Sequence, residues 1–148
     1  MGNTILGTSV KEKDLGVTVS ADMTVSEQCG LAASKGNQIL GLIRRNITYM
    51  ENTLIIPLYK AIVRPHLEYC IQAWRPHHTK DIDKLERVHR RATKLIPELK
   101  YLCYERRLLE CRITTLETRI LRDLIEVLKI LNGYEDIDSN IFFKTKIK

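Results

Sequence analysis

The chain has 148 residues, which is enough for one domain with a sizeable core, and 44% of them are hydrophobic while 28% are charged. The formal net charge of +6 and the pI of about 9.2 favour a polyanionic partner, either nucleic acid or an acidic membrane surface. No apolar stretch approaches the roughly 20 residues that span a bilayer, so a membrane-spanning protein is excluded from our expectations.

The N-terminal residues do not resemble a signal for export or lipid attachment. They lack the leading basic cluster and the apolar run of a signal peptide, and Leu6 stands where a myristoylation motif has Ser or Thr. We therefore expect an intracellular chain, in the cytoplasm or nucleus. Its four cysteines form no CxxC pair, so we expect reduced, mostly buried, small apolar side chains at Cys29, Cys70, Cys103 and Cys111.

The segment from Ile5 to Val19 predicts a β-hairpin. Lys11–Lys13 have the polar character of a turn, and the following residues alternate between apolar and small or polar types, which predicts one buried row at Leu15, Val17 and Val19. Two strands alone are marginally stable. We therefore expect a loose hairpin that belongs to a larger sheet and that exposes an apolar patch when the sheet is missing.

A helix is predicted next, with Thr24 and Glu27 as a capping box at its start. Its apolar residues recur at helical spacing at Cys29, Ala32, Ala33, Leu40, Ile43 and Ile47. Three glycines inside this helix, Gly30, Gly36 and Gly41, lower its propensity. Close helix packing is the favoured explanation for them, and close approach of a nucleic-acid backbone is the alternative.

A second helical pattern runs from about Asn52 to Trp74. Pro57 and Pro65 predict a kink or break near each, because proline removes a backbone donor and clashes with the previous turn. The expected buried stripe consists of Ile55, Leu58, Ile62, His66, Tyr69 and Ala73. A turn over Arg75–Thr79 follows.

The most informative helix is predicted from a cap at Thr79 to about Ile96, with Pro97 at its end. At about 100° per residue, one face collects Ile82, Leu85, Val88, Ala92, Leu95 and Ile96, and the opposite face collects Lys80, Lys84, Arg87, Arg90, Arg91 and Lys94. Acids are confined to the first two turns, where they suit the helix dipole. The basic half is either a solvated face or a phosphate-contacting one, and both interpretations stay open.

Two further helices are expected. A short one covers about Tyr104 to Glu110, and a longer one follows a capping box at Thr114 and Glu117 and ends near Gly133. The apolar stripe of the longer helix comprises Leu116, Ile120, Leu124, Val127, Leu128 and Leu131.

The sequence thus predicts a mainly α protein, with a short N-terminal β-hairpin followed by a bundle of about four to five helices. We divide it into a hairpin region over 1–23, a helical domain over 24–133 and a flexible tail over 134–148.

Residues that could carry chemistry are few. His66 and Cys70 share a helical face, and His77 and His78 are near in sequence, but no second ligand pair has metal-site spacing, so we expect no metal. A polymerase needs clustered carboxylates to hold two metal ions, and Asp22 has no adjacent second Asp. Asp22 is interpreted as a residue that precedes a helix, and no catalytic residue is assigned.

Four phrases carry a resemblance to a known family: residues 9–17, SVKEKDLGV; 39–45, ILGLIRR; 58–69, LYKAIVRPHLEY; and 85–97, LERVHRRATKLIP. In this order they resemble the C-terminal region of non-LTR (LINE, jockey-like) retrotransposon reverse transcriptases. The likeness runs from about Met1 to Gly133, nearly the whole chain.

The resemblance implies that residues 1–23 are a remnant of the palm end and residues 24–133 a thumb-like domain. Leu15, Gly16 and Val17 then correspond to a primer-grip-like hairpin. The catalytic Ala-Asp-Asp motif and the endonuclease of the family lie outside the resembling region. A fragment of an RNA-directed DNA polymerase is therefore implied, inactive by itself, with Mg²⁺ expected only for the intact parent enzyme and no cofactor for this chain.

Three functions are weighed. The first is a thumb-like grip that holds an RNA or DNA duplex non-specifically through Lys84, Arg87, Arg90, Arg91 and Lys94, with the missing palm domain as a further partner and no membrane. The second is a basic helical adaptor that binds a protein or an acidic membrane and has no nucleic-acid role. The third is an active polymerase whose carboxylates come from another chain or a longer transcript.

Overall fold

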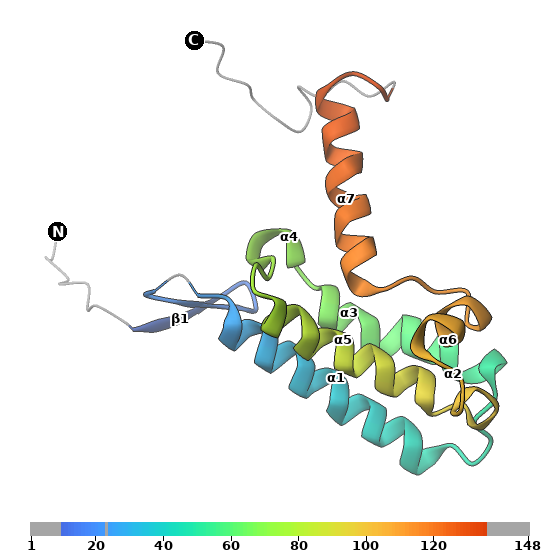
Figure 1. Ribbon diagram of the computed structural model, residues 1–148. Coiled ribbons are helices and arrows are strands. Elements are labelled where there is room, and N and C mark those ends of the chain that lie inside the picture. Colours follow the sequence, from blue (N-terminus) through green and yellow to red (C-terminus); the bar gives the residue numbers. More distant parts are fainter. Residues whose placement is uncertain (1–9, 23, 136–148) are drawn as a thin grey trace, which may run out of the picture. The chain divides into compact units, whose positions relative to one another are not determined.

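The computed structural model describes residues 10–22 and 24–135, which are mainly helical and begin with a two-stranded hairpin (Figure 1). By internal contacts the chain divides into two units, residues 1–113 and residues 114–148, and each is described by itself. In the described part, no helix is both long and apolar enough to cross a membrane. The mainly α fold with an N-terminal hairpin is as predicted.

The hairpin pairs β1 (Lys11–Asp14) with β2 (Val17–Ser20) in antiparallel register. Its two-residue turn is Leu15-Gly16, both with positive φ (44° and 85°), and not Lys11–Lys13 as predicted from polarity. A tight hairpin turn needs positive φ, which glycine supplies readily, whereas the charged residues belong to a fully exposed strand.

Only one residue of the predicted apolar row is buried. Val17 packs inside, while Val19 is 44% exposed and Leu15, in the turn, is 82% exposed. The hairpin is attached to the helices by polar contacts: the Thr18 amide donates to Gln28 Oε1 at 3.0 Å, and the Tyr69 hydroxyl donates to the Leu15 carbonyl at 3.0 Å. The expected looseness of this hairpin remains a prediction.

Helix α1 (Ser26–Asn46) buries its predicted face, except that Ile47 is its half-buried C-cap. The predicted capping box is wrong. Val25 is the N-cap, and no side-chain hydrogen bond caps the helix. The Thr24 hydroxyl, the predicted cap, donates to Asp22 Oδ1 at 3.0 Å instead. Asp22 also accepts from the Thr24 amide at 3.1 Å, so this carboxylate closes the turn that precedes α1, as interpreted from the sequence.

The region with two prolines is broken as predicted: α2 (Asn52–Leu58) contains Pro57 and leads into a π-helical stretch, η1 (Tyr59–Val63), and Pro65 opens α3 (Arg64–Glu68). The predicted stripe is wrong beyond Ile55. Buried instead are Ile56, Tyr59, Val63, Leu67, Ile71 and Trp74, the last two in α4 (Ile71–Trp74). A π-turn holds more residues than an α-turn, so Tyr59, Val63 and Leu67, which are four residues apart, lie on the same buried face. A stripe predicted at 3.6 residues per turn therefore no longer coincides with that face.

Helix α5 (Thr79–Lys94) lies along α1 and carries the predicted core residues Leu85, Val88 and Ala92 (Figure 1). His78, not Thr79, is its N-cap, without a side-chain hydrogen bond. Four polar residues of α5 are also buried, which periodicity did not indicate: Asp81, Glu86, His89 and Thr93. A short 3₁₀ turn, η2 (Pro97–Leu99), follows the helix.

The last helices are α6 (Tyr104–Glu110), as predicted, and, in the second unit, α7 (Leu116–Leu131). Thr115, not Thr114, caps α7 and accepts from the Thr118 amide at 3.1 Å. Gly133 ends the helix with φ of 70°, and the Tyr134 amide donates to the Lys129 carbonyl at 2.9 Å, as expected for a glycine C-cap. The predicted tail lies outside the described residues after Glu135.

All four cysteines are free, as expected, but only two are buried. Cys29 and Cys111 are buried, whereas Cys70 and Cys103 are exposed, so the expectation of mostly buried thiols holds for half of them. Cys70 has a positive φ of 51° where α3 passes to α4, which places its side chain outside the regular helix.

Close packing explains only one of the three glycines in α1. A Cβ at Gly36 would lie 3.0 Å from both Leu67 and Val88, which are fully buried. At Gly30 and Gly41, a Cβ would meet no described heavy atom within 4 Å. The favoured packing explanation is therefore correct for Gly36 and wrong for Gly30 and Gly41.

This difference predicts opposite effects on stability. Gly36→Ala should destabilise the fold by about 1–3 kcal/mol, because Leu67 and Val88 cannot move aside without disturbing the core. Gly41→Ala should stabilise it by up to about 1 kcal/mol through helix propensity. Urea denaturation of both variants measures this, and equal shifts in the same direction would contradict the packing described.

Candidate nucleic-acid interface

The predicted basic residues of α5 are mostly accessible. Arg87, Arg90, Arg91 and Lys94 are exposed, and Lys84 is half-buried. The helix therefore has a buried inner side, which carries the predicted apolar residues Leu85, Val88 and Ala92 together with four polar ones, and a cationic outer side over its last three turns. Tertiary contacts nevertheless divide these cations into groups with different surroundings.

Lys84 is held by a buried carboxylate. Its Nζ lies 2.8 Å from Asp81 Oδ1 and 2.9 Å from Ser26 Oγ, and Ser26 donates to the same carboxylate oxygen at 2.7 Å. Burial acts to raise the pKa of Asp81, but the hydrogen bonds from Lys84 and Ser26 outweigh it, so the net pKa lies below its usual range. The position of Lys84 is thus fixed, and part of its charge is offset.

The same carboxylate affects Cys29. Burial first, and the nearby charge of Asp81 second, raise the pKa of the Cys29 thiol to about 11. The thiolate is the reactive form of cysteine, so this buried side chain is chemically inert at neutral pH.

Arg90 faces a different neighbour. Its guanidinium carbon lies 4.9 Å from the centre of the Tyr104 ring, and Arg107 lies 5.5 Å from the same ring. This cation–π contact directs Arg90 toward α6. The single basic face predicted from the helical wheel is therefore divided, with Arg90 on the α6 side and Arg87, Arg91 and Lys94 on the α1 side.

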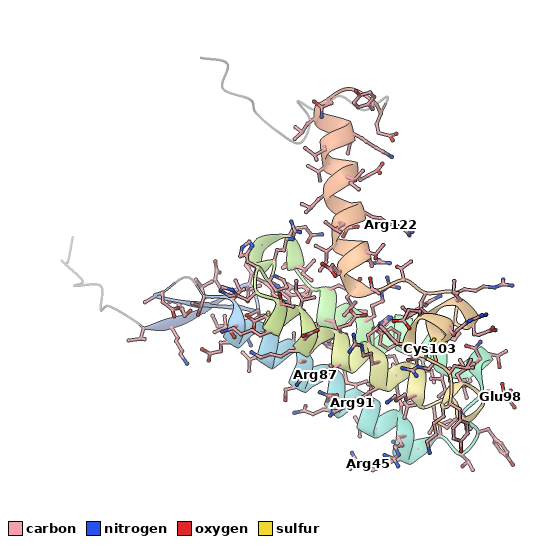
Figure 2. The ribbon with its side chains drawn as sticks, in the orientation of Figure 1. Arg45, Arg87, Arg91, Glu98, Cys103 and Arg122 are labelled. Atoms are coloured by element: carbon pink, nitrogen blue, oxygen red, sulfur yellow. The ribbon has the colours of Figure 1, made fainter. Side chains whose placement is uncertain are left out.

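Two grooves run along the α1 side of α5, each with a volume of about 610 Å³. Asn37 and Arg91 line both, so the two grooves adjoin at this pair. Arg91 Nη1 donates to Asn37 Oδ1 at 2.8 Å. Figure 2 shows Arg87 and Arg91 where α5 runs beside α1. We name the two grooves together the basic track. Its cations are Arg44, Lys84, Arg87, Arg91, Lys94 and Lys100.

No Asp or Glu is among the described residues that line the basic track, nor is any Phe, Tyr or Trp. Polar neutral side chains complete it at Ser34, Asn37 and Gln38. Cations with amide and hydroxyl groups match the phosphate oxygens of a nucleic-acid backbone. Single strands are usually gripped by aromatic stacking platforms, and the track offers none.

Sequence reasoning missed two cations of the track. Arg44 lies in the last turn of α1, and Lys100 follows η2. The only signal was the Arg44-Arg45 pair at the end of a predicted helix, which also suits the helix dipole. Neither residue could be assigned to the same surface as α5 before the two helices were seen side by side.

The primer-grip-like residues lie elsewhere. Leu15, Gly16 and Val17 form the hairpin turn and the start of β2, and none of them is among the track residues. Leu15 and Val17 line a separate, mostly apolar hollow of about 300 Å³, together with Val19, Val25, Cys70 and Trp74.

The residues weighed for a metal site are dispersed on the surface. His66, Cys70, His77 and His78 are all exposed, and over residues 10–22 and 24–135 no group of three or more His, Cys, Asp or Glu side chains is arranged to hold a metal ion. The carboxylate of Asp22 is used by its own turn. Hydrogen bonds from Ser20 and then Thr24 lower its pKa.

Beneath the cationic side of α5 lies a buried polar cluster. His89 Nδ1 and the Tyr59 hydroxyl share a hydrogen bond of 2.5 Å, and the Tyr104 hydroxyl donates to Glu86. His89 Nε2 is buried without a hydrogen-bond partner among the described residues. Burial and, to a lesser degree, the charge of Arg64 lower the pKa of His89 to about 4.

This lowered pKa predicts that the fold begins to lose stability, as the pH falls, at a higher pH than the range in which carboxylates usually titrate. An unfolded histidine titrates near pH 6.5, so below that pH the unfolded chain binds a proton that the folded chain excludes until about pH 4. The contribution of His89 to the free energy of unfolding should be constant above about pH 7 and fall by on the order of 3 kcal/mol across this window. Denaturation of the native chain and of His89→Gln over the same pH series measures it. An identical pH slope in the two proteins would contradict the assignment.

Comparisons of this chain with protein-family models, with curated proteins and with solved structures found no match.

Proposed function

We propose that this chain holds duplex nucleic acid through its phosphates, without reading the sequence, as the thumb-like part of a retrotransposon-type RNA-directed DNA polymerase. The carrying observation is the basic track, two adjoining grooves lined by six cations with no acid among their described lining residues. Phosphates dominate non-specific nucleic-acid affinity, and cations on rigid helices suit that task.

One feature of the track supports a duplex over a single strand, and a second supports binding without sequence preference. Its described lining contains no aromatic side chain on which an unpaired base could stack. Its guanidinium and ammonium groups can contact phosphates whatever the bases are, which gives affinity without sequence preference.

The family resemblance supplies the thumb-like role. The two phrases ILGLIRR and LERVHRRATKLIP lie on α1 and α5, the helices that form the track. No carboxylate pair suited to two-metal catalysis was found in the sequence, so in this proposal the chain contributes grip and a partner palm domain contributes the chemistry.

A second candidate is a helical adaptor that binds another protein. The apolar hollow beside the hairpin favours it, because two apolar residues that line it are exposed, Leu15 by 82% and Val19 by 44%. Exposed apolar groups of this kind are typical of protein contacts.

The salt dependence of binding tests the proposal. Each phosphate contact on a duplex should contribute about 0.9 to the slope of log affinity against log salt. The triple variant Arg87→Gln, Arg91→Gln, Lys94→Gln should therefore lower this slope by roughly two to three, equally for duplexes of unrelated sequence. Fluorescence anisotropy over a salt series measures it.

A matched control removes three exposed cations that do not line the track: Lys13→Gln, Lys60→Gln, Arg106→Gln. This control should change the slope little. An unchanged slope in the track variant, with helicity intact by circular dichroism, would favour the adaptor. Equal loss in both triple variants would show diffuse attraction only, and tight binding to anionic vesicles without duplex binding would identify a membrane surface as the partner.

A further inference from the structure

The basic track has a floor as well as a cationic wall. Gly30 lines one groove and Gly41 the other, both from α1. They are 11 residues apart in one helix, so they lie nearly in line along its axis, about 16 Å apart. The wall opposite comes from α5, which contributes Lys84, Arg87, Arg91 and Lys94.

Helix packing does not account for these two glycines. A Cβ at either would meet no described atom within 4 Å, whereas the third glycine of the helix, Gly36, is enclosed by Leu67 and Val88 at 3.0 Å. Each glycine weakens the helix relative to alanine. What Gly30 and Gly41 provide is a lower groove floor, where another backbone can approach α1 closely.

The cations along the track are partly fixed before any ligand arrives. Lys84 is held by Asp81 and Ser26, and Arg91 is held across the groove by Asn37 of α1. Groups ordered in advance lose less conformational entropy on binding. Two cations of the track are therefore held in place before a ligand binds: Arg91, where the two grooves adjoin, and Lys84, in one of them.

We propose that one sugar-phosphate strand of the bound duplex lies lengthwise in the basic track, between α1 and α5, with Gly30 and Gly41 beneath it and Arg44 and Lys100 as contacts at its far end. This inference rests on the proposed function and specifies the path of one strand, with the glycines of α1 beneath it. From Gly30 to Arg44 the track spans about 21 Å of helix, which equals the rise of about six base pairs along a duplex axis.

The first experiment removes the two far-end cations. Arg44→Gln with Lys100→Gln should lower the salt slope for duplex binding by about 1.8, and affinity at physiological salt by on the order of tenfold. The matched control, Lys60→Gln with Arg106→Gln, removes the same charge from exposed positions outside the track and should leave the slope within experimental error of the native chain.

The second experiment fills the floor without changing charge. Gly30→Gln and Gly41→Gln should each weaken duplex binding several-fold while the melting temperature stays level or rises, because each side chain enters open space on a helix. Gly36→Ala is the contrasting variant. It should lower the melting temperature, yet bind normally wherever circular dichroism shows it folded.

The outcomes separate this inference from the proposed function. If the α5 triple variant loses affinity while the Arg44/Lys100 pair and both floor variants bind like the native chain, the grip stands and the path along α1 is overturned. If the α5 triple variant itself binds normally, the proposed function fails. Loss in the far-end pair and the floor variants, with the Lys60/Arg106 control unchanged, supports the path.

Discussion

The close contact at Gly36 is the constraint on which the first unit depends. Without a Cβ at this position, α1 can lie against both Leu67 of α3 and Val88 of α5, two of the most buried side chains of the core. A Cβ here would lie 3.0 Å from both side chains, so even alanine would force the neighbours to shift by a few tenths of an ångström in a densely packed core. The same contact brings the outer sides of α1 and α5 together, so the core packing and the basic track have one geometric origin.

The inner side of α5 is unusual in its polarity. Asp81, Glu86, His89 and Thr93 are buried on a helix that otherwise packs through apolar residues. Each finds a partner from another element: Ser26 for Asp81, Tyr104 for Glu86, Tyr59 for His89, and Arg107 Nε for Thr93 at 3.1 Å. Buried polar groups destabilise a fold unless they are hydrogen-bonded, so these contacts favour one arrangement of α5, α6 and η1 over others of similar apolar burial.

The cations of α5 have three different surroundings. Lys84 lines the track but is paired with Asp81, Arg90 stacks on Tyr104 outside the track, and Arg87, Arg91 and Lys94 line the track without a carboxylate partner among the described residues. A cation that is already paired or stacked contributes less to a distant anion than one that faces an open groove, because part of its field is offset or its side chain is fixed elsewhere. A helical wheel of α5 therefore includes Arg90, which does not line the track, and omits Arg44 and Lys100, which do.

The sequence by itself determined the mainly α class, the helices over α1, α5, α6 and α7, and the apolar and basic sides of α5, because these depend on periodicity within one continuous segment. It could not determine the π-helical stretch Tyr59–Val63, which displaced the buried stripe by changing the number of residues per turn, nor the choice of Leu15-Gly16 as the hairpin turn. Only the tertiary structure decided which glycine of α1 is packed and which faces open space, and which cations share a groove. Those properties depend on distances between segments far apart in the chain, and no local pattern encodes them.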